Sequence, residues 1–135
     1  MARGGAIRTS ASYSDRMGRP SVLLVEDNPL DALLITEQLG ASYAFRRAES
    51  LSAAVREIQA TPPEAAVADL TLPAGRGPAV IEALRAVAPD VPLIAHSGMD
   101  AQIAADAALT AGARAYVTKS SSGSELLAAL KSILG

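Results

Sequence analysis

The sequence contains no cysteine and no tryptophan, and aromatic residues make up only 3% of its 135 residues. The absence of cysteine excludes disulfides, thiolate metal sites and a cysteine nucleophile. It is compatible with the cytoplasm, where we expect the protein. The longest apolar runs are far shorter than the ~20 residues that a membrane-spanning helix needs, so we expect no membrane partner. Half of the residues are hydrophobic, which predicts an aliphatic core.

The charge is unevenly distributed along the chain. Residues 1–20 carry four of the 12 basic residues and one of the 14 acidic ones, which leaves 8 basic and 13 acidic residues and a formal charge of −5 for the remainder. An acidic body argues against nucleic acid as the main partner, because binding to phosphate backbones needs basic patches. It suits a domain that binds a divalent cation.

The length and the local composition predict one folded domain. Compact domains most often have ~100–150 residues. Residues 1–20 are rich in Gly, Ser and Arg and show no helical or strand periodicity, so we predict a disordered leader there, with an Arg- and Ser-rich transit peptide as the alternative. Residues 21–135 are predicted to form the folded domain.

From Ser21 onward, short apolar segments alternate with segments of helical spacing. Predicted strands cover 22–25, 43–45, 65–68, 91–95 and 115–117. Each is followed by a predicted helix, and residues 73–78 read as a loop. Strict alternation predicts an α/β fold with a parallel sheet. Five units are too few for an eight-stranded barrel, so we predict an open, doubly wound, five-stranded parallel sheet.

The first predicted helix has clear boundary signals. Asn28 is a favoured N-cap, Pro29 suits the first helical position, and Gly40 suits the end of the helix. Four leucines are predicted to form its buried apolar stripe: Leu30, Leu33, Leu34 and Leu39.

Polar side chains follow four of the predicted strands. In an open α/β sheet the ligand site lies beyond the carboxyl ends of the strands, so we expect three carboxylates, a hydroxyl and an amine to converge there: Glu26, Asp27, Asp69, Ser97 and Lys119. Crowded carboxylates repel each other, and Mg²⁺ relieves this by taking one or two carboxylates together with water and phosphate oxygens. A lysine suits a phosphoryl oxygen, and an aspartate can accept a phosphoryl group covalently.

These residues resemble those of the bacterial response-regulator receiver domain. The motifs LLVEDNP, VADLTLP, LIAHSG and GARAYVTK each fall on the expected element, and Asp27, Asp69, Ser97 and Lys119 are 42, 28 and 22 residues apart in that order. The resemblance covers residues 21–135. It implies a flavodoxin-like (βα)₅ fold and a receiver module of two-component signalling, which we expect to be either a stand-alone regulator or a part of a longer chain.

The resemblance also implies roles for residues around the acidic cluster. Asp69 would be the phosphoacceptor, and Asp27 a direct Mg²⁺ ligand. Glu26 would act mostly through a metal-bound water, and the backbone carbonyl of Thr71 would be the third protein ligand. The phosphoryl donor would be a sensor histidine kinase or a histidine phosphotransfer protein.

Three further roles follow from the same resemblance. Lys119 would pair with the phosphoryl group, Ser97 would be the hydroxyl switch, and Tyr116 the aromatic residue whose rotamer follows it. The altered surface would be the face formed by the fourth helix, fifth strand and fifth helix, which binds a downstream protein. Such a module is no enzyme acting on a separate substrate, although it catalyses its own phosphorylation and dephosphorylation. Ser97 as a helix cap and Tyr116 as a packing residue are the simpler interpretations.

The sequence departs from the family pattern at a few positions. Ser120 stands where the family usually has proline, which favours a trans bond after Lys119 because a cis bond without proline costs ~3–4 kcal/mol. Ser97 replaces the commoner threonine, while Thr71 and Met99 occupy positions that tune dephosphorylation. The sole histidine, His96, is interpreted as structural.

Two other functions remain open on the sequence alone. One is a binding scaffold that is never phosphorylated, which Ser120 alone favours. The other is a small aspartyl-phosphate phosphatase, which would need a second aspartate as acid and base where Thr71 stands. Incubation with a small phosphodonor and Mg²⁺ distinguishes the three: stable labelling, no reaction, or turnover.

Overall fold

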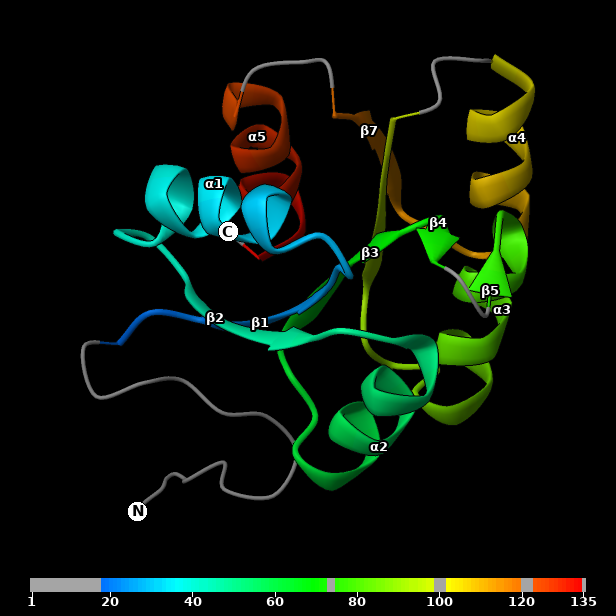
Figure 1. Cartoon of the computed structure of the whole chain (residues 1–135), viewed down its shortest axis with the longest axis horizontal. Coiled ribbons are helices and arrows are strands. Elements are labelled where there is room, and N and C mark those ends of the chain that lie inside the picture. The colour runs from blue at the N-terminus through cyan, green and yellow to red at the C-terminus, as the bar shows by residue number, and fades with distance from the viewer. Residues whose placement is uncertain (1–17, 73–74, 99–101, 120–122, 135) are drawn as a thin grey trace.

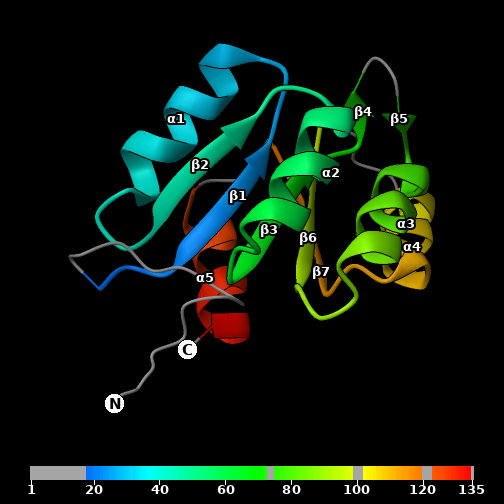
Figure 2. The same ribbon diagram turned by 90° about the horizontal axis from the view of Figure 1, so that it is seen from below.

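The computed structural model describes residues 18–72, 75–98, 102–119 and 123–134. Among these residues, five parallel strands form one sheet in the order β2-β1-β3-β6-β7, which can be followed in Figures 1 and 2 together. They are β1 (Ser21–Val25), β2 (Ala44–Ala48), β3 (Ala65–Asp69), β6 (Leu93–Ser97) and β7 (Ala115–Thr118). This confirms the predicted doubly wound, five-stranded parallel sheet.

In the described part of the chain, five helices are present, and Figures 1 and 2 show that they cover both faces of the sheet. They are α1 (Pro29–Leu39), α2 (Leu51–Ala60), α3 (Pro78–Val87), α4 (Gln102–Ala111) and α5 (Gly123–Leu134). One core cluster packs α1 and α5 against the sheet, and a second packs α2, α3 and α4 against the opposite face. Every residue of the central strands β1, β3 and β6 is buried, as expected for strands covered on both sides.

Helix α1 begins as predicted but buries a different face. The Asn28 side chain accepts hydrogen bonds from the N–H groups of Leu30 and Asp31, at 2.9 and 3.2 Å. The predicted leucine stripe is wrong for three of its four members, because Leu30, Leu33 and Leu34 are 68%, 52% and 54% exposed, whereas Leu39 is buried. The buried residues have i, i+3, i+7 spacing, which selects one face of a helix: Ala32, Ile35 and Leu39.

Several boundaries also differ from the prediction. Strand β6 covers residues 93–97 rather than 91–95, so His96 and Ser97 are part of the strand rather than following it. Strand β2 continues past Phe45 to Ala48. The predicted loop 73–78 contains the short strand β5 (Gly75–Arg76), which pairs antiparallel with β4 (Thr71–Leu72). Apolar alternation does not detect such short, polar pairs.

Some predictions fall on residues that the structure does not describe. These are most of the predicted leader (residues 1–17), Met99 and Ser120. Pro20, which was assigned to the leader, joins the sheet, because its carbonyl accepts a hydrogen bond of 2.9 Å from the N–H of Ala44. No helix within the described ranges is long and apolar enough to cross a membrane.

Candidate functional site

Three carboxylates lie together at the carboxyl edge of the sheet. Glu26 and Asp27 directly follow β1, and Asp69 is the last residue of the neighbouring strand β3. Each offers one oxygen, and these atoms all lie within 4.8 Å of one another. Glu26 and Asp69 are only 1% and 3% exposed, so two of the three charges are withdrawn from water. The predicted convergence of these residues is therefore observed.

Lys119 joins the cluster from the end of β7. Its Nζ lies 2.8 Å from Glu26 Oε1 and 3.1 Å from Asp69 Oδ2. The contact with Asp69 is also a hydrogen bond. The contact with Glu26 is an ion pair only, since Glu26 Oε1 has no partner in hydrogen-bond geometry. The Lys119 N–H donates to the carbonyl of Ser97 at 2.7 Å, which fixes the chain end that carries the lysine.

Asp31 is a further member of the site that the sequence reasoning missed. Its Oδ2 lies 2.8 Å from Lys119 Nζ, as a hydrogen-bonded ion pair. An acidic residue in the first turn of a helix is common because it favours the helix dipole, so Asp31 gave no separate signal. Asp27 precedes the N-cap of the helix, so the spacing of the two aspartates did not indicate a shared helical face either.

Thr71 lies two residues beyond Asp69 and holds one of its oxygens. The Thr71 backbone N–H and hydroxyl donate to Asp69 Oδ1 at 2.9 and 2.8 Å. These donors favour the ionised carboxylate. The predicted metal contact through the Thr71 carbonyl stays a prediction.

The environment moves the pKa values of the two buried carboxyl groups in opposite directions. Burial raises the pKa of Glu26 to about 7, although Lys119 and the N–H of Asn28 partly oppose it. Burial alone would also raise the pKa of Asp69, but the two Thr71 hydrogen bonds, Glu26 and Lys119 outweigh it and the net shift is downward. The cluster therefore contains one carboxyl group, Glu26, whose pKa is near 7, and one, Asp69, that is ionised at neutral pH.

Lys119 keeps its charge despite partial burial. Burial lowers its pKa, but the contacts with Asp31, Glu26 and Asp69 raise it more, so the net shift is upward. The ammonium group is therefore positively charged while it pairs with these three carboxylates.

His96 lies beside Lys119 on the face of the sheet covered by α1 and α5. Burial, and then the charge of Lys119, lower the pKa of His96 to about 4. Its Nδ1 is buried without a hydrogen-bond partner in the described part of the chain. Together with Asp31 and Lys119 it lines a small pocket of about 110 Å³. Its burial agrees with the structural interpretation.

Ser97 and Tyr116 lie on the other face of the sheet. Ser97 ends β6 and is fully buried. Tyr116 on β7 lies opposite Ala95 and packs, half-buried, against the core beneath α2, α3 and α4. Ser97 and Ala95 point to the same side because side chains alternate along a strand. The predicted switch pair therefore occupies neighbouring strands on one face, and its roles stay predictions.

The donor set suits a hard divalent cation. Carboxylate oxygens are the ligands that Mg²⁺ and Ca²⁺ prefer, and the cluster offers three within a short distance. Burial raises the pKa of Glu26, and the neighbouring Asp69 adds a smaller upward contribution, so a bound cation would favour the ionised form of Glu26. Glu26, Asp27 and Asp69 thus fit the predicted magnesium site.

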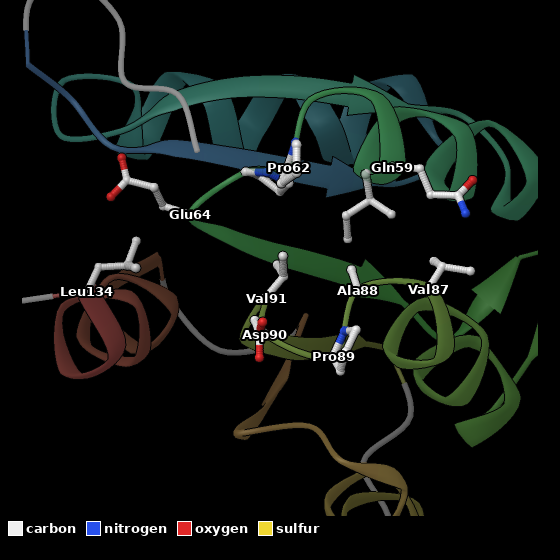
Figure 3. A pocket seen from close by; sticks show the side chains of 11 residues that line it. Gln59, Pro62, Glu64, Val87, Ala88, Pro89, Asp90, Val91 and Leu134 are labelled. Carbon is white, nitrogen blue, oxygen red and sulfur yellow. The ribbon is translucent and has the colours of Figure 1, made fainter. Parts of the chain in front are cut away.

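A larger pocket of about 540 Å³ lies at the opposite edge of the sheet (Figure 3). Its lining comes from the segments before β3 and β6 and from the ends of α2, α3 and α5, and includes Pro62, Glu64, Val87, Asp90 and Leu134. It contains no member of the acidic cluster. The acidic cluster therefore lies apart from this more spacious cavity.

Comparison with known proteins agrees with this geometry. The model of the response regulator receiver domain matches residues 22–131. The photosynthetic apparatus regulatory protein RegA of Rhodovulum sulfidophilum is 34% identical over 114 residues, which cover 84% of this chain and 62% of that protein. The chain spans between 60% and 66% of the length of four such curated relatives.

Two solved structures are similar in fold and in sequence. A two-component response regulator of the LuxR family from an Aurantimonas species has a TM-score of 0.80 at 29% identity, covering 86% of this chain and 85% of that one. A response regulator from Burkholderia pseudomallei, solved with a phosphorylated aspartic acid, a calcium ion and citrate, has a TM-score of 0.74 at 28% identity. That match covers 82% of this chain and 66% of the other.

Proposed function

Because the chain belongs to the response regulator receiver domain family, we propose that Asp69 accepts a phosphoryl group from a phosphohistidine. The donor would be a sensor histidine kinase or a histidine phosphotransfer protein. The observation that carries the proposal is Lys119, whose Nζ contacts Asp69 Oδ2 at 3.1 Å beside the cluster of three carboxylates. The phosphorylated aspartate and calcium ion of the Burkholderia regulator support the same chemistry.

We assign the cation to Glu26, Asp27 and Asp69, with the carbonyl of Thr71 as a further ligand. When bound, Mg²⁺ supplies positive charge to the phosphoryl oxygens and lets the carboxylates remain ionised. Glu26 would lose its proton when the ion binds, because burial raises its pKa to about 7. Asp27 is more exposed than its two neighbours and can reach the ion from the solvent side.

Asp69 performs the covalent step in this proposal. One carboxylate oxygen attacks phosphorus while the phosphorus–nitrogen bond of the donor breaks, and the released imidazole takes up a proton. The product is an acyl phosphate on Asp69. Lys119 contributes its charge to the transferred group, and the hydrogen bonds from Thr71 orient the nucleophile.

The response of the protein is proposed to start at Ser97. A phosphoryl group brings new acceptor oxygens, and the Ser97 hydroxyl is the donor on the neighbouring strand. Movement of Ser97 would let Tyr116 turn inward. The surface formed by α4, β7 and α5 would then change its affinity for a downstream protein.

The protein acts as a signalling module in this proposal, with catalysis limited to its own phosphorylation and dephosphorylation. A phosphatase would need a second carboxyl group two residues after Asp69, and Thr71 offers only a hydroxyl and an N–H there. Asp31 does not replace it, because it already pairs with Lys119.

The test is labelling of the 135-residue chain with acetyl phosphate and Mg²⁺, followed by intact mass measurement. We expect a stable increment of one phosphoryl group in the wild type and none in Asp69→Asn. Asp90→Asn is the matched control, since this exposed aspartate lies at the opposite edge of the sheet. An unlabelled wild type would indicate a binding scaffold, and turnover of the donor without labelling would indicate a phosphatase.

A further inference from the structure

Lys119 contacts three carboxylates, and only two of them belong to the proposed ion site. Glu26 and Asp69 are part of the acidic cluster. Asp31 approaches the lysine from the first turn of α1, and its Oδ2 lies 2.8 Å from Nζ. The Asp31 side chain is 34% exposed, against 1% for Glu26 and 2% for Asp69. Asp31 is therefore a partner of Lys119 that lies outside the acidic cluster.

Lys119 is also the partner on which Asp31 depends. Within the described residues Asp31 has no other ion pair. The pocket of about 110 Å³ beside it contains one further polar amide, Gln38, and the neutral His96 among its lining residues, but no second cation. Within the described residues, Lys119 is thus the one cation that forms an ion pair with Asp31.

A bound cation would change which of the three carboxylates Lys119 pairs with. Mg²⁺ at Glu26 and Asp69 would neutralise both carboxylates and repel the ammonium group. Asp31 would then be the anion left to Lys119. Because the lysine carries a compact charge on a flexible stem, it can lean toward Asp31 without moving the backbone.

We infer that Asp31 is a positioning residue that competes with the incoming phosphoryl group for Lys119 and so slows phosphorylation of Asp69. The inference rests on the proposed function. A phosphoryl group on Asp69 can pair with the Lys119 ammonium group only if the ion pair with Asp31 breaks. An anionic donor is also repelled by the partly exposed negative charge of Asp31. Both effects oppose transfer. The same ion pair keeps Lys119 from competing with Mg²⁺ for Glu26 and Asp69.

Asp31→Asn separates these two effects because they have opposite signs. When the Asp31 carboxylate is absent, Lys119 pairs more with Glu26 and Asp69, so Mg²⁺ binding to those two residues should weaken. At saturating Mg²⁺, labelling by acetyl phosphate should instead become faster. We expect each change to be about two- to fivefold, as for a partly exposed charge pair. Asparagine keeps the shape of the first helical turn, and Asp31→Glu should stay close to the wild type.

Glu37→Gln is the matched control, since Glu37 is an exposed carboxylate on the same helix. It should change neither the Mg²⁺ affinity, measured by calorimetry, nor the labelling rate. A double-mutant cycle tests the route of action. In a Lys119→Met background, Asp31→Asn should no longer weaken Mg²⁺ binding in the way it does in the wild type.

A role in stability alone would lower the melting temperature and the labelling rate together. The inference is overturned if Asp31→Asn labels at or below the wild-type rate at saturating Mg²⁺ while the wild type labels at Asp69. An unlabelled wild type would instead overturn the proposed function, and the inference with it.

Discussion

Thr71 holds one oxygen of Asp69 through two donors, its N–H at 2.9 Å and its hydroxyl at 2.8 Å. Lys119 contacts the other oxygen at 3.1 Å. Both oxygens of the proposed nucleophile are therefore held in place before any donor arrives. This arrangement lowers the pKa of Asp69 although the group is buried.

The hydroxyl of Thr71 can be tested separately from its N–H. Thr71→Val removes the hydroxyl and keeps the backbone donor and the approximate shape. We expect the pKa of the Asp69 carboxyl to rise, because a hydrogen bond to the ionised form is lost. Carbon NMR of the labelled aspartates in Mg²⁺-free buffer measures the titration. Thr110→Val on exposed α4 is the control, and an unchanged Asp69 titration would contradict the assigned role.

Mg²⁺ should stabilise the fold, because it neutralises three crowded carboxylates. Ligand at 100 times its dissociation constant adds ~2.7 kcal/mol to the free energy of unfolding. Melting curves with chelator and with excess Mg²⁺ measure the difference. Asp27→Asn should reduce it, whereas Asp106→Asn on α4 should not. Identical wild-type curves under the two conditions would exclude a cation site of this kind.

The raised pKa of Glu26 predicts how stability depends on pH without metal. The folded protein holds this proton up to about pH 7, while an ordinary glutamate loses it near 4.5. Folding therefore takes up a proton within this window, so the contribution of Glu26 to stability falls as pH rises from 4.5 to 7. One pKa unit corresponds to ~1.4 kcal/mol, so the total loss between pH 4.5 and pH 7 is at most roughly 4 kcal/mol.

Glu26→Gln removes this titration without changing the size of the side chain. In Mg²⁺-free buffer the variant should be more stable than the wild type at pH 8, and the difference should shrink toward pH 5. Chemical denaturation across this range measures it. Glu64→Gln, at the opposite edge of the sheet, is the control for general charge effects. A difference that is constant with pH would show that Glu26 titrates normally.

The proposed switch can be tested at Ser97. Ser97→Ala should still be labelled at Asp69, but should lose most of the response of residues 112–119 to phosphorylation. Amide exchange or NMR shifts with and without beryllofluoride measure that response, and the expected effect on partner affinity is ~1–3 kcal/mol. If the variant responds fully around Tyr116, the hydroxyl is not the switch.

Residues 1–16 are predicted to be dispensable for folding and phosphorylation, because they carry no apolar periodicity to bury. Their deletion should leave thermal stability and labelling unchanged. The shortened chain retains Pro20, whose carbonyl accepts a hydrogen bond from the N–H of Ala44 in β2. A large loss in either measurement would show that the segment packs on the domain.

Sequence reasoning was most accurate where backbone pattern and polar residues coincide. The central strands are continuous apolar runs, and this placed Asp27, Asp69 and Lys119 at one edge of the sheet. It failed on α1, where residue type alone suggested that leucines are buried. Ala32 and Ile35 are buried instead. The rotation of a helix about its own axis depends on the elements it packs against, and its composition alone does not determine it.

The contacts of Lys119 were predictable only in part. Its convergence with Asp69 follows from the topology of parallel strands, whereas its pair with Asp31 depends on how α1 is rotated. Asp31 lies between Leu30 and Leu33 in the sequence, and both leucines are exposed, so this segment gives no sign of that rotation. Likewise, the grip of Thr71 on Asp69 depends on the short β4–β5 pair, which no periodicity indicates.

The pairing of β6 with β7 has a consequence for variation among related chains. Successive residues point to opposite layers, so His96 and Lys119 lie toward α1 and α5, while Ser97 and Tyr116 lie toward the layer that contains α4. Substitutions that adapt one layer to a new partner thus need not disturb the other. Insertion of one residue within 93–97 would move the side chains beyond it to the opposite layers, so a change in the length of this strand affects both layers at once.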